Sequence, residues 1–159
     1  MDVLFLGKGS DCRPLLAEAI FNHLAPEHLR ARRLACDREE ALAPAALALL
    51  AAQGIRPVRA GTPAICGEPS ASDVVITICS ADADGRCPHR AAMPLHAHWA
   101  VHDPLRRHFF AHREDRELLD VYHILRARIE RLLPLLLAGV EQDRLHLGRE
   151  LERIGRFLP

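Results

Sequence analysis

A short glycine-containing segment near the start of the chain has the layout of an anion-binding loop. The segment GKGSDCR, residues 7–13, follows the apolar run of residues 3–6 and precedes a helical pattern. Backbone N–H groups in such a turn bind anions together with the positive dipole end of the following helix. The candidate anion-binding residues are Gly7, Lys8, Gly9, Ser10, Asp11, Cys12 and Arg13. By itself the pattern is weakly specific, because many strand-to-helix turns contain glycine.

A second group of candidate residues is rich in histidine. Six of the ten histidines lie in residues 89–112, from His89 to His112. Imidazole ligates zinc, copper and nickel, so His96, His98 and His102 are candidate metal ligands, with Cys87 as a fourth. Their spacing matches no standard site, and surface histidines in place of lysine are the favoured interpretation. We therefore expect no metal and no other cofactor.

Composition restricts the class of protein that must position these residues. The chain has 159 residues, 49% of them hydrophobic and 26% charged, which is typical of one globular domain. Lys plus Arg and Asp plus Glu both number 21, which argues against broad binding to nucleic acid. No apolar run approaches the roughly 20 residues of a membrane helix, and the first residues lack a signal-peptide pattern. We expect a cytoplasmic protein of bacterial type whose five cysteines are reduced.

Periodicity predicts alternating strands and helices. We expect strands at residues 3–6, 32–36 and 73–78, with a weaker strand around residues 93–96, and helices at residues 14–24, 44–53 and 113–137. Asp11 is the expected N-cap of the first helix, and Pro134 is expected to kink or end the last. This order predicts an α/β three-layer sandwich with a short parallel sheet of about four strands flanked by helices. Ligands bind at the carboxyl edge of such sheets, where the loops after Leu6 and Ile78 belong.

The end of the chain predicts one additional helix. Beyond Gly139, an apolar stripe of helical spacing is formed by Val140, Leu147, Leu151, Ile154 and Leu158. We therefore divide the chain into a domain at residues 1–138 and a C-terminal amphipathic helical extension at residues 139–159. The stripe must be buried, either on its own domain or in a homodimer or partner contact.

Four collinear segments carry a family resemblance. Residues 3–25, VLFLGKGSDCRPLLAEAIFNHLA, resemble the opening of the low-molecular-weight protein tyrosine phosphatases, and most of all the thioredoxin-coupled arsenate reductases of the same fold. The helix ending in Gln53-Gly54-Ile55 supports the resemblance, as do the segments DVVITICSADADGRCP and HWAVHDP. Together they span about residues 2–137. The resemblance implies the phosphatase fold, a phosphate-like oxyanion ligand, a thioredoxin-type reductant and a role in arsenic resistance.

The loop departs from the family where the family does its chemistry. The resemblance places the nucleophilic cysteine at position 7, which is Gly7 here, and the oxyanion-binding arginine at Arg13. Glycine offers no attacking atom. Pro14 replaces a hydroxyl residue, and Asp11 adds negative charge beside the anion. We expect a non-catalytic homologue that binds an oxyanion or a partner; the alternatives are a relocated nucleophile at Cys12 or Cys79, and a metal-binding module on residues 89–112.

The resemblance also assigns roles beyond the loop. Cys79 and Cys87 match the pair of cysteines that relays oxidation to a disulfide, and Asp103 matches the general acid. Each role has a structural alternative. The two thiols are then remnants, Asp103 caps a helix beginning near Leu105, and Arg13 pairs with Asp11 or with a helix carboxylate.

Overall fold

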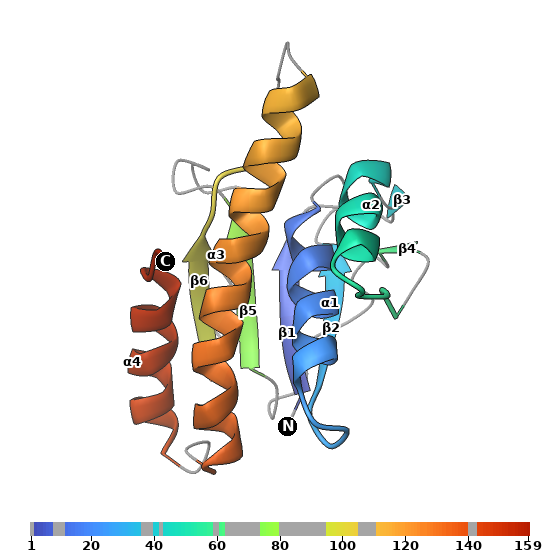
Figure 1. Cartoon of the computed structure of the whole chain (residues 1–159). Helices are drawn as coiled ribbons and strands as arrows, with labels where there is room; N and C mark the ends of the chain where they lie inside the picture. Colours follow the sequence, from blue (N-terminus) through green and yellow to red (C-terminus); the bar gives the residue numbers. More distant parts are fainter. Residues whose placement is uncertain are drawn as a thin grey trace.

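Four parallel strands form the centre of the molecule. The computed structural model describes residues 2–7, 12–35, 40–41, 43–58, 61–62, 74–79, 95–104, 111–139 and 143–159. The sheet has the order β2-β1-β5-β6 and consists of β1 (Asp2–Gly7), β2 (Arg30–Ala35), β5 (Val74–Cys79) and β6 (His96–Ala100) (Figure 1). Two residues each of β3 (Glu40–Ala41) and β4 (Gly61–Thr62) form a separate antiparallel pair. The predicted α/β fold with a short parallel sheet is confirmed.

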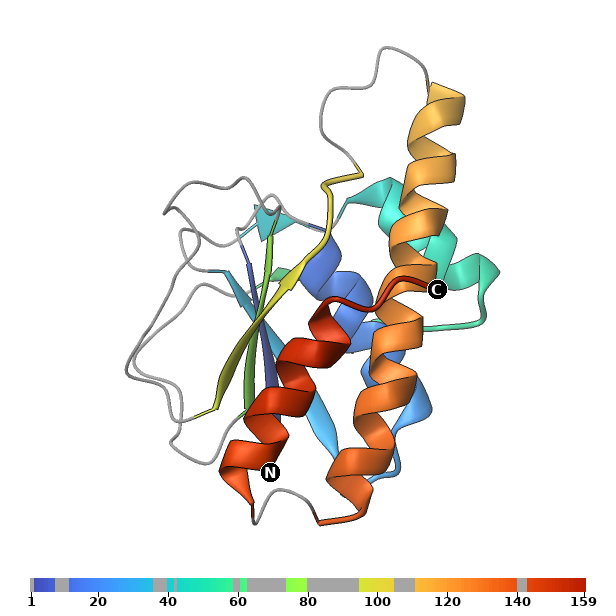
Figure 2. The same ribbon diagram turned by 90° about the vertical axis from the view of Figure 1, so that its left-hand side faces the viewer.

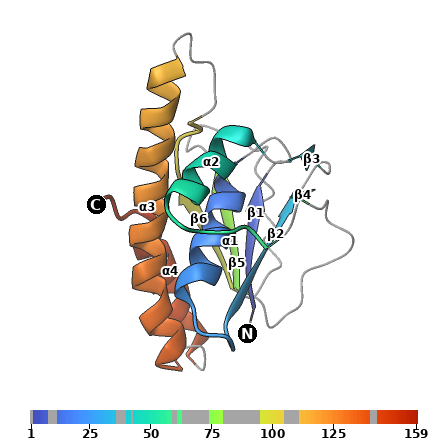
Figure 3. The ribbon, with the colours of Figure 1, turned by 45° about the vertical axis from the view of Figure 1, so that its right-hand side comes forward.

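Four helices lie on one side of this sheet (Figures 2 and 3). They are α1 (Arg13–Leu24), α2 (Pro44–Ala52), α3 (Ala111–Leu137) and α4 (Arg144–Gly155). Helices α1 and α4 pack directly on the strands, and α3 runs beside both. None of the described helices is long and apolar enough to cross a membrane.

The apolar strands are buried on both faces. In β1, Val3 and Phe5 belong to the core under the helices, whereas Leu4 and Leu6 form a second cluster with Val75 of β5. All five side chains are at most 1% exposed. A strand covered on both faces lacks polar alternation, which explains why residues 3–6 read as a continuous apolar run.

Two predicted boundaries were wrong. The strand expected around residues 93–96 is β6 at His96–Ala100, because its alternating Ala97 and Trp99 are the side chains that the core buries. The N-cap of α1 is Cys12 and not Asp11, and it makes no side-chain capping bond. Pro14 lies in the first turn as expected. Helix α3 continues past Pro134 to Leu137, the end that its apolar stripe predicted.

The C-terminal helix packs on its own chain. Leu147, Leu151 and Ile154 of α4 are buried in the same core as the sheet. The indole N–H of Trp99 in β6 donates to the carbonyl of Leu151 at 3.1 Å. Leu158 is 67% exposed and does not join this stripe, and Val140 lies outside the described residues. The own-domain alternative therefore accounts for the burial of α4.

Candidate functional site

The carboxyl edge of the sheet carries the described ends of the predicted functional segments. Parallel strands β1, β5 and β6 end there at Gly7, Cys79 and Ala100. Helix α1 begins at Arg13, so the loop after Gly7 leads into its N-terminus at this edge. Lys8, Gly9, Ser10 and Asp11 lie outside the described residues, as does Cys87.

Arg13 links the loop to the neighbouring strands. Its side chain is 5% exposed, and Nη1 donates a hydrogen bond to the carbonyl of Val101, directly after β6. The Val101 N–H in turn donates to the carbonyl of Cys79 at 3.0 Å. The described bond of Arg13 is thus to a backbone carbonyl, and pairing with Asp11 falls outside the described residues. These two hydrogen bonds hold the ends of β5 and β6 next to the first residue of α1.

Asp103, Cys12 and Cys79 lie at the same edge and differ in their exposure to solvent. Asp103 is half-buried and follows Val101 by two residues, so the Arg13 bond also positions the segment that carries it. The helix predicted near Leu105 falls outside the described residues, and α3 is described from Ala111. Cys12 is 3% exposed, whereas Cys79 is half-buried and more accessible to solvent.

A polar group that the sequence did not reveal occupies the sheet face opposite the helices. It consists of Thr77 and Cys79 of β5 with His96 and His98 of β6, and is called the Thr77 cluster below. Thr77 Oγ1 lies 3.1 Å from His96 Nε2 and 3.1 Å from His98 Nδ1. The Cys79 sulfur lies 3.7 Å from His98 Nε2 and 3.8 Å from Nδ1. The histidine alternation in residues 96–98 was the available signal, because alternate residues of a strand share a face.

Comparison with known protein families agrees with this geometry. The model of the family "Low molecular weight phosphotyrosine protein phosphatase" matches residues 2–146. The chain belongs to this phosphatase family. No curated protein matches the chain in sequence.

Solved structures similar to this phosphatase-family chain include several arsenate reductases. That of Archaeoglobus fulgidus has a TM-score of 0.63 and 18% identity, over 80% of this chain and 98% of that one. The thioredoxin-dependent arsenate reductase of Corynebacterium glutamicum has a TM-score of 0.58 and 19% identity, over 89% of this chain and 62% of that one. An arsenate reductase in the phosphate binding state has a TM-score of 0.59 and 21% identity, over 87% of this chain and 98% of that one. At these identities the similarities establish the fold.

The described histidines of this phosphatase-family chain's histidine-rich segment do not form a metal site. His96 and His98 share one face of β6, whereas His102 is exposed beyond the end of the strand. Among the described residues, no three side chains of His, Cys, Asp or Glu lie close enough together to hold a metal ion. His89, His108 and the His112 side chain fall outside the described part.

A buried arginine that sequence reasoning missed supports the edge from the helix side. Arg128 of α3 is 2% exposed and donates to the carbonyls of Ala100 and Phe157 at 3.2 and 3.0 Å. Burial lowers the pKa of Arg128 to about 10, so the guanidinium is still charged at neutral pH. Through its two hydrogen bonds, Arg128 connects the C-terminal residues to the end of β6.

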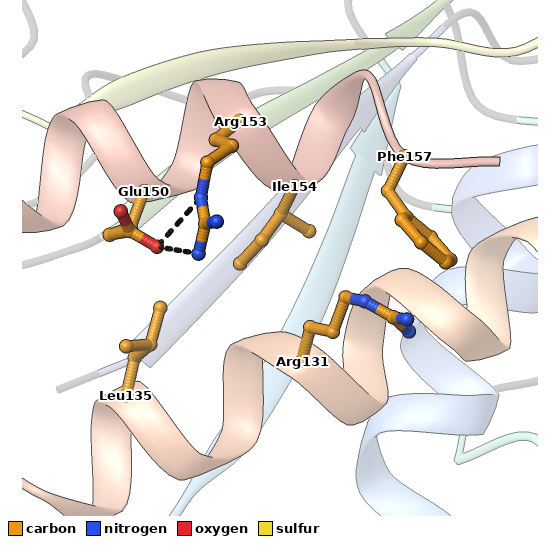
Figure 4. Close-up of a pocket in the computed structure, with 6 residues that line it drawn as sticks. All are labelled: Arg131, Leu135, Glu150, Arg153, Ile154 and Phe157. Carbon is orange, nitrogen blue, oxygen red and sulfur yellow. Dashed lines mark hydrogen bonds and ion pairs between the residues drawn. The ribbon is translucent and has the colours of Figure 1, made fainter.

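A pocket of about 220 Å³ lies between α3 and α4 (Figure 4). The Arg131 guanidinium stacks over the Phe157 ring at 3.4 Å, and Arg153 pairs with Glu150 at 2.6 Å. The pocket is lined by Arg131, Leu135, Glu150, Arg153, Ile154 and Phe157. None of the predicted site residues is among them, so the pocket is separate from the carboxyl-edge site.

Proposed function

We propose that the chain binds a phosphate-like oxyanion at the loop between β1 and α1 without turning it over through position 7. The observation that carries the proposal is the buried Arg13 guanidinium at the first residue of α1, in the loop that follows Gly7. A guanidinium beside a helix N-terminus suits a tetrahedral anion, because both present N–H donors and positive charge. The similar arsenate reductase in the phosphate binding state supports phosphate as the probe.

Loss of covalent catalysis follows from the chemistry of Gly7. The family resemblance requires a thiolate at this position, and glycine supplies none. Asp11 and Pro14 also disfavour a thiolate at position 7, so Gly7→Cys alone is expected to restore little aryl-phosphate turnover. Aryl-phosphate turnover by the wild-type chain well above background, unchanged by Cys12→Ser, would refute the loss.

Isothermal titration with phosphate, arsenate and sulfate tests binding. We expect Arg13→Met to weaken phosphate binding by about tenfold or more, because a charged hydrogen bond contributes roughly 1.5–3 kcal/mol. Arg131→Met is the control, since it removes an exposed arginine of α3 that lies outside the loop, and it should leave binding within about twofold. Equal weakening in both variants, or no heat in the wild type at millimolar phosphate, would exclude this site.

The second candidate function is thiol-dependent arsenate reduction by a relocated nucleophile. The contact between the Cys79 sulfur and His98 favours Cys79, and the burial of Cys12 disfavours the other position. The two electrons would come from Cys79 and Cys87, which the family resemblance pairs, and a thioredoxin-type reductant would restore the thiols. Mild oxidation should give an intramolecular Cys79–Cys87 disulfide by mass spectrometry. Reaction at Cys36 or Cys66 alone, with no thiol consumed by arsenate, would exclude the relay.

A further inference from the structure

The pocket between α3 and α4 has an apolar lining that the backbone holds in place. Leu135 of α3 and Ile154 of α4 point into it from the two helices, and the half-buried ring of Phe157 lies at one end (Figure 4). The Phe157 N–H donates to the carbonyl of Ile154 at 2.9 Å, and the Phe157 carbonyl accepts from Nε of the buried Arg128 at 3.0 Å. The end of the pocket that Phe157 forms is therefore preorganised for a ligand.

The same pocket has an excess of positive charge. Its lining contains two arginines, Arg131 and Arg153, and one carboxylate, Glu150. Arg153 donates from Nε and Nη2 to Glu150 Oε2, at 3.1 and 2.6 Å, so the charge of this carboxylate is compensated. In the part of the chain that the structure describes, Arg131 has no ion pair, and Nη1 donates to the carbonyl of Ala127 at 3.0 Å. Arg131 is therefore the cation of the pocket that an anionic ligand can neutralise.

The position of Arg131 suits a carboxylate in particular. Its guanidinium carbon lies 3.4 Å from the centroid of the Phe157 ring. A guanidinium on a ring face keeps its N–H donors at its edge, where a planar carboxylate can accept two parallel hydrogen bonds. Arginine does not deprotonate in proteins, so this charge is present at every pH at which the chain is folded.

We propose that this pocket binds a small carboxylate that has an apolar body. Arg131 would bind the carboxylate, and Leu135, Ile154 and Phe157 would cover the body. The volume of about 220 Å³ is below the roughly 300–1,000 Å³ of pockets that take drug-sized ligands, so a body of one ring is the expected size. Inorganic phosphate has no apolar part to bury, so this ligand class differs from that of the loop between β1 and α1.

The pocket depends on residues beyond the family match. The family model ends at residue 146, whereas Glu150, Arg153, Ile154 and Phe157 follow it. Without these residues only Arg131 and Leu135 of the lining remain. The proposed carboxylate site is therefore an addition of the C-terminal helix, and it is independent of whether the loop binds an oxyanion.

Titration of the full chain with three small probes, followed by NMR of the backbone amides, tests the ligand class. Benzoate, which is ionised at pH 7, should shift signals of residues 150–157 saturably, with a dissociation constant of about 1 mM or below. Benzamide keeps the ring and lacks the charge, and acetate keeps the charge and lacks the ring. Both should bind at least about fivefold more weakly, because each loses one of the two interactions. Benzamide or acetate binding as well as benzoate overturns the proposal, as does the absence of a saturable shift with benzoate.

Three variants in phosphate-free buffer test the role of Arg131. Arg131→Met should weaken benzoate binding about fivefold or more and remove the preference over benzamide. Arg126→Met is the matched control on the same helix, since Arg126 pairs with Glu130 outside the pocket, and it should stay within about twofold. Glu150→Gln should tighten benzoate binding about twofold or more, because it removes a negative charge and leaves Arg153 available.

The opposite directions of these changes separate ligand binding from a loss of structure. Equal weakening in both arginine variants overturns the proposal, and so does weaker benzoate binding by Glu150→Gln. If Arg131→Met does not fold, the comparison of benzoate with benzamide in the wild type decides. Phosphate is absent from these titrations, so their failure and the failure of oxyanion binding at the loop are distinguishable.

Discussion

The two faces of strand β6 differ in polarity and in burial. Ala97 and Trp99 face the helices, where Trp99 is fully buried and lies 6.2 Å from the ring of Phe5. His96 and His98 face the opposite side and contact the hydroxyl of Thr77. One five-residue strand thus contributes apolar packing to one layer and hydrogen-bonding groups to the other.

The difference shows that one strand can contribute core packing on one face and polar contacts on the other. On the helix face, α4 closes over Trp99, and close packing there resists any change of volume. On the other face, the Thr77 hydroxyl contacts ring nitrogens of His96 and His98, and these polar contacts depend on hydrogen-bond direction. Substitutions on the helix face should therefore lower the free energy of unfolding by more than substitutions in the Thr77 cluster.

Trp99→Ala is the strongest test of the helix face. Removing a fully buried indole and its bond to Leu151 should lower the free energy of unfolding by about 3–5 kcal/mol. Urea denaturation followed by circular dichroism measures the change. His102→Ala, at an exposed position beyond the strand, should stay within about 0.5 kcal/mol. A loss below about 1 kcal/mol for Trp99→Ala would mean that α4 does not close this face.

Arg128→Met tests the bonds that hold the end of β6 against the helices. The carbonyls of Ala100 and Phe157 lose their donor, so unfolding should become easier by about 1–3 kcal/mol. Arg131→Met, which removes an exposed cation stacked on Phe157, should have a smaller effect of about 0.5–1 kcal/mol. Urea midpoints at one pH compare the two, and an equal loss would contradict the special role of Arg128.

The pH dependence of Arg128→Met follows from the lowered pKa. Burial brings this pKa to about 10 in the native state, below its value in the unfolded chain. Above about pH 10 the unfolded state binds more protons, so stability that depends on Arg128 rises with pH there. Between pH 6 and 8 both states are charged, and the difference between variant and wild type should be constant. A slope over that range would assign the titration to another group.

Two glycines of α4 test the tight fit against Trp99. A Cβ at Gly155 would lie 2.6 Å from Trp99 Cδ1 and 3.1 Å from the carbonyl oxygen of His98, whereas one at Gly148 meets nothing within 4 Å. Gly155→Ala should destabilise by about 1–3 kcal/mol because the buried indole has no room to move. Gly148→Ala should stabilise by about 0.5–1 kcal/mol through helix propensity. Thermal melts of both variants measure this, and the same sign of change in both would disprove the close contact.

Thr77→Val tests the polar face of the sheet. The shape is nearly kept and the hydroxyl lost, so the free energy of unfolding should fall by about 1 kcal/mol. Urea denaturation followed by circular dichroism measures the change. A loss as large as that of Trp99→Ala would contradict the difference between the two faces.

The sequence by itself determined most of the elements and the family. Residues 3–6 and 73–78 predicted β1 and β5 because doubly buried strands are continuously apolar, and α1 to α4 followed from helical spacing. These signals are local, so one sequence suffices to read them. The misplaced β6 is the exception, since HAHWA alternates and its assignment depends on which face the core buries.

Only the tertiary structure decided which distant groups meet. Arg13 and Val101 are 88 residues apart, and Thr77 and His98 are 21 apart; both pairs are set by strand order and register. The histidines therefore read as possible metal ligands in the sequence, although they flank a buried hydroxyl and a thiol in the fold. Residue spacing along the chain does not specify the register between parallel strands joined by long crossovers, because that register is fixed by side chains packing on both faces of the sheet.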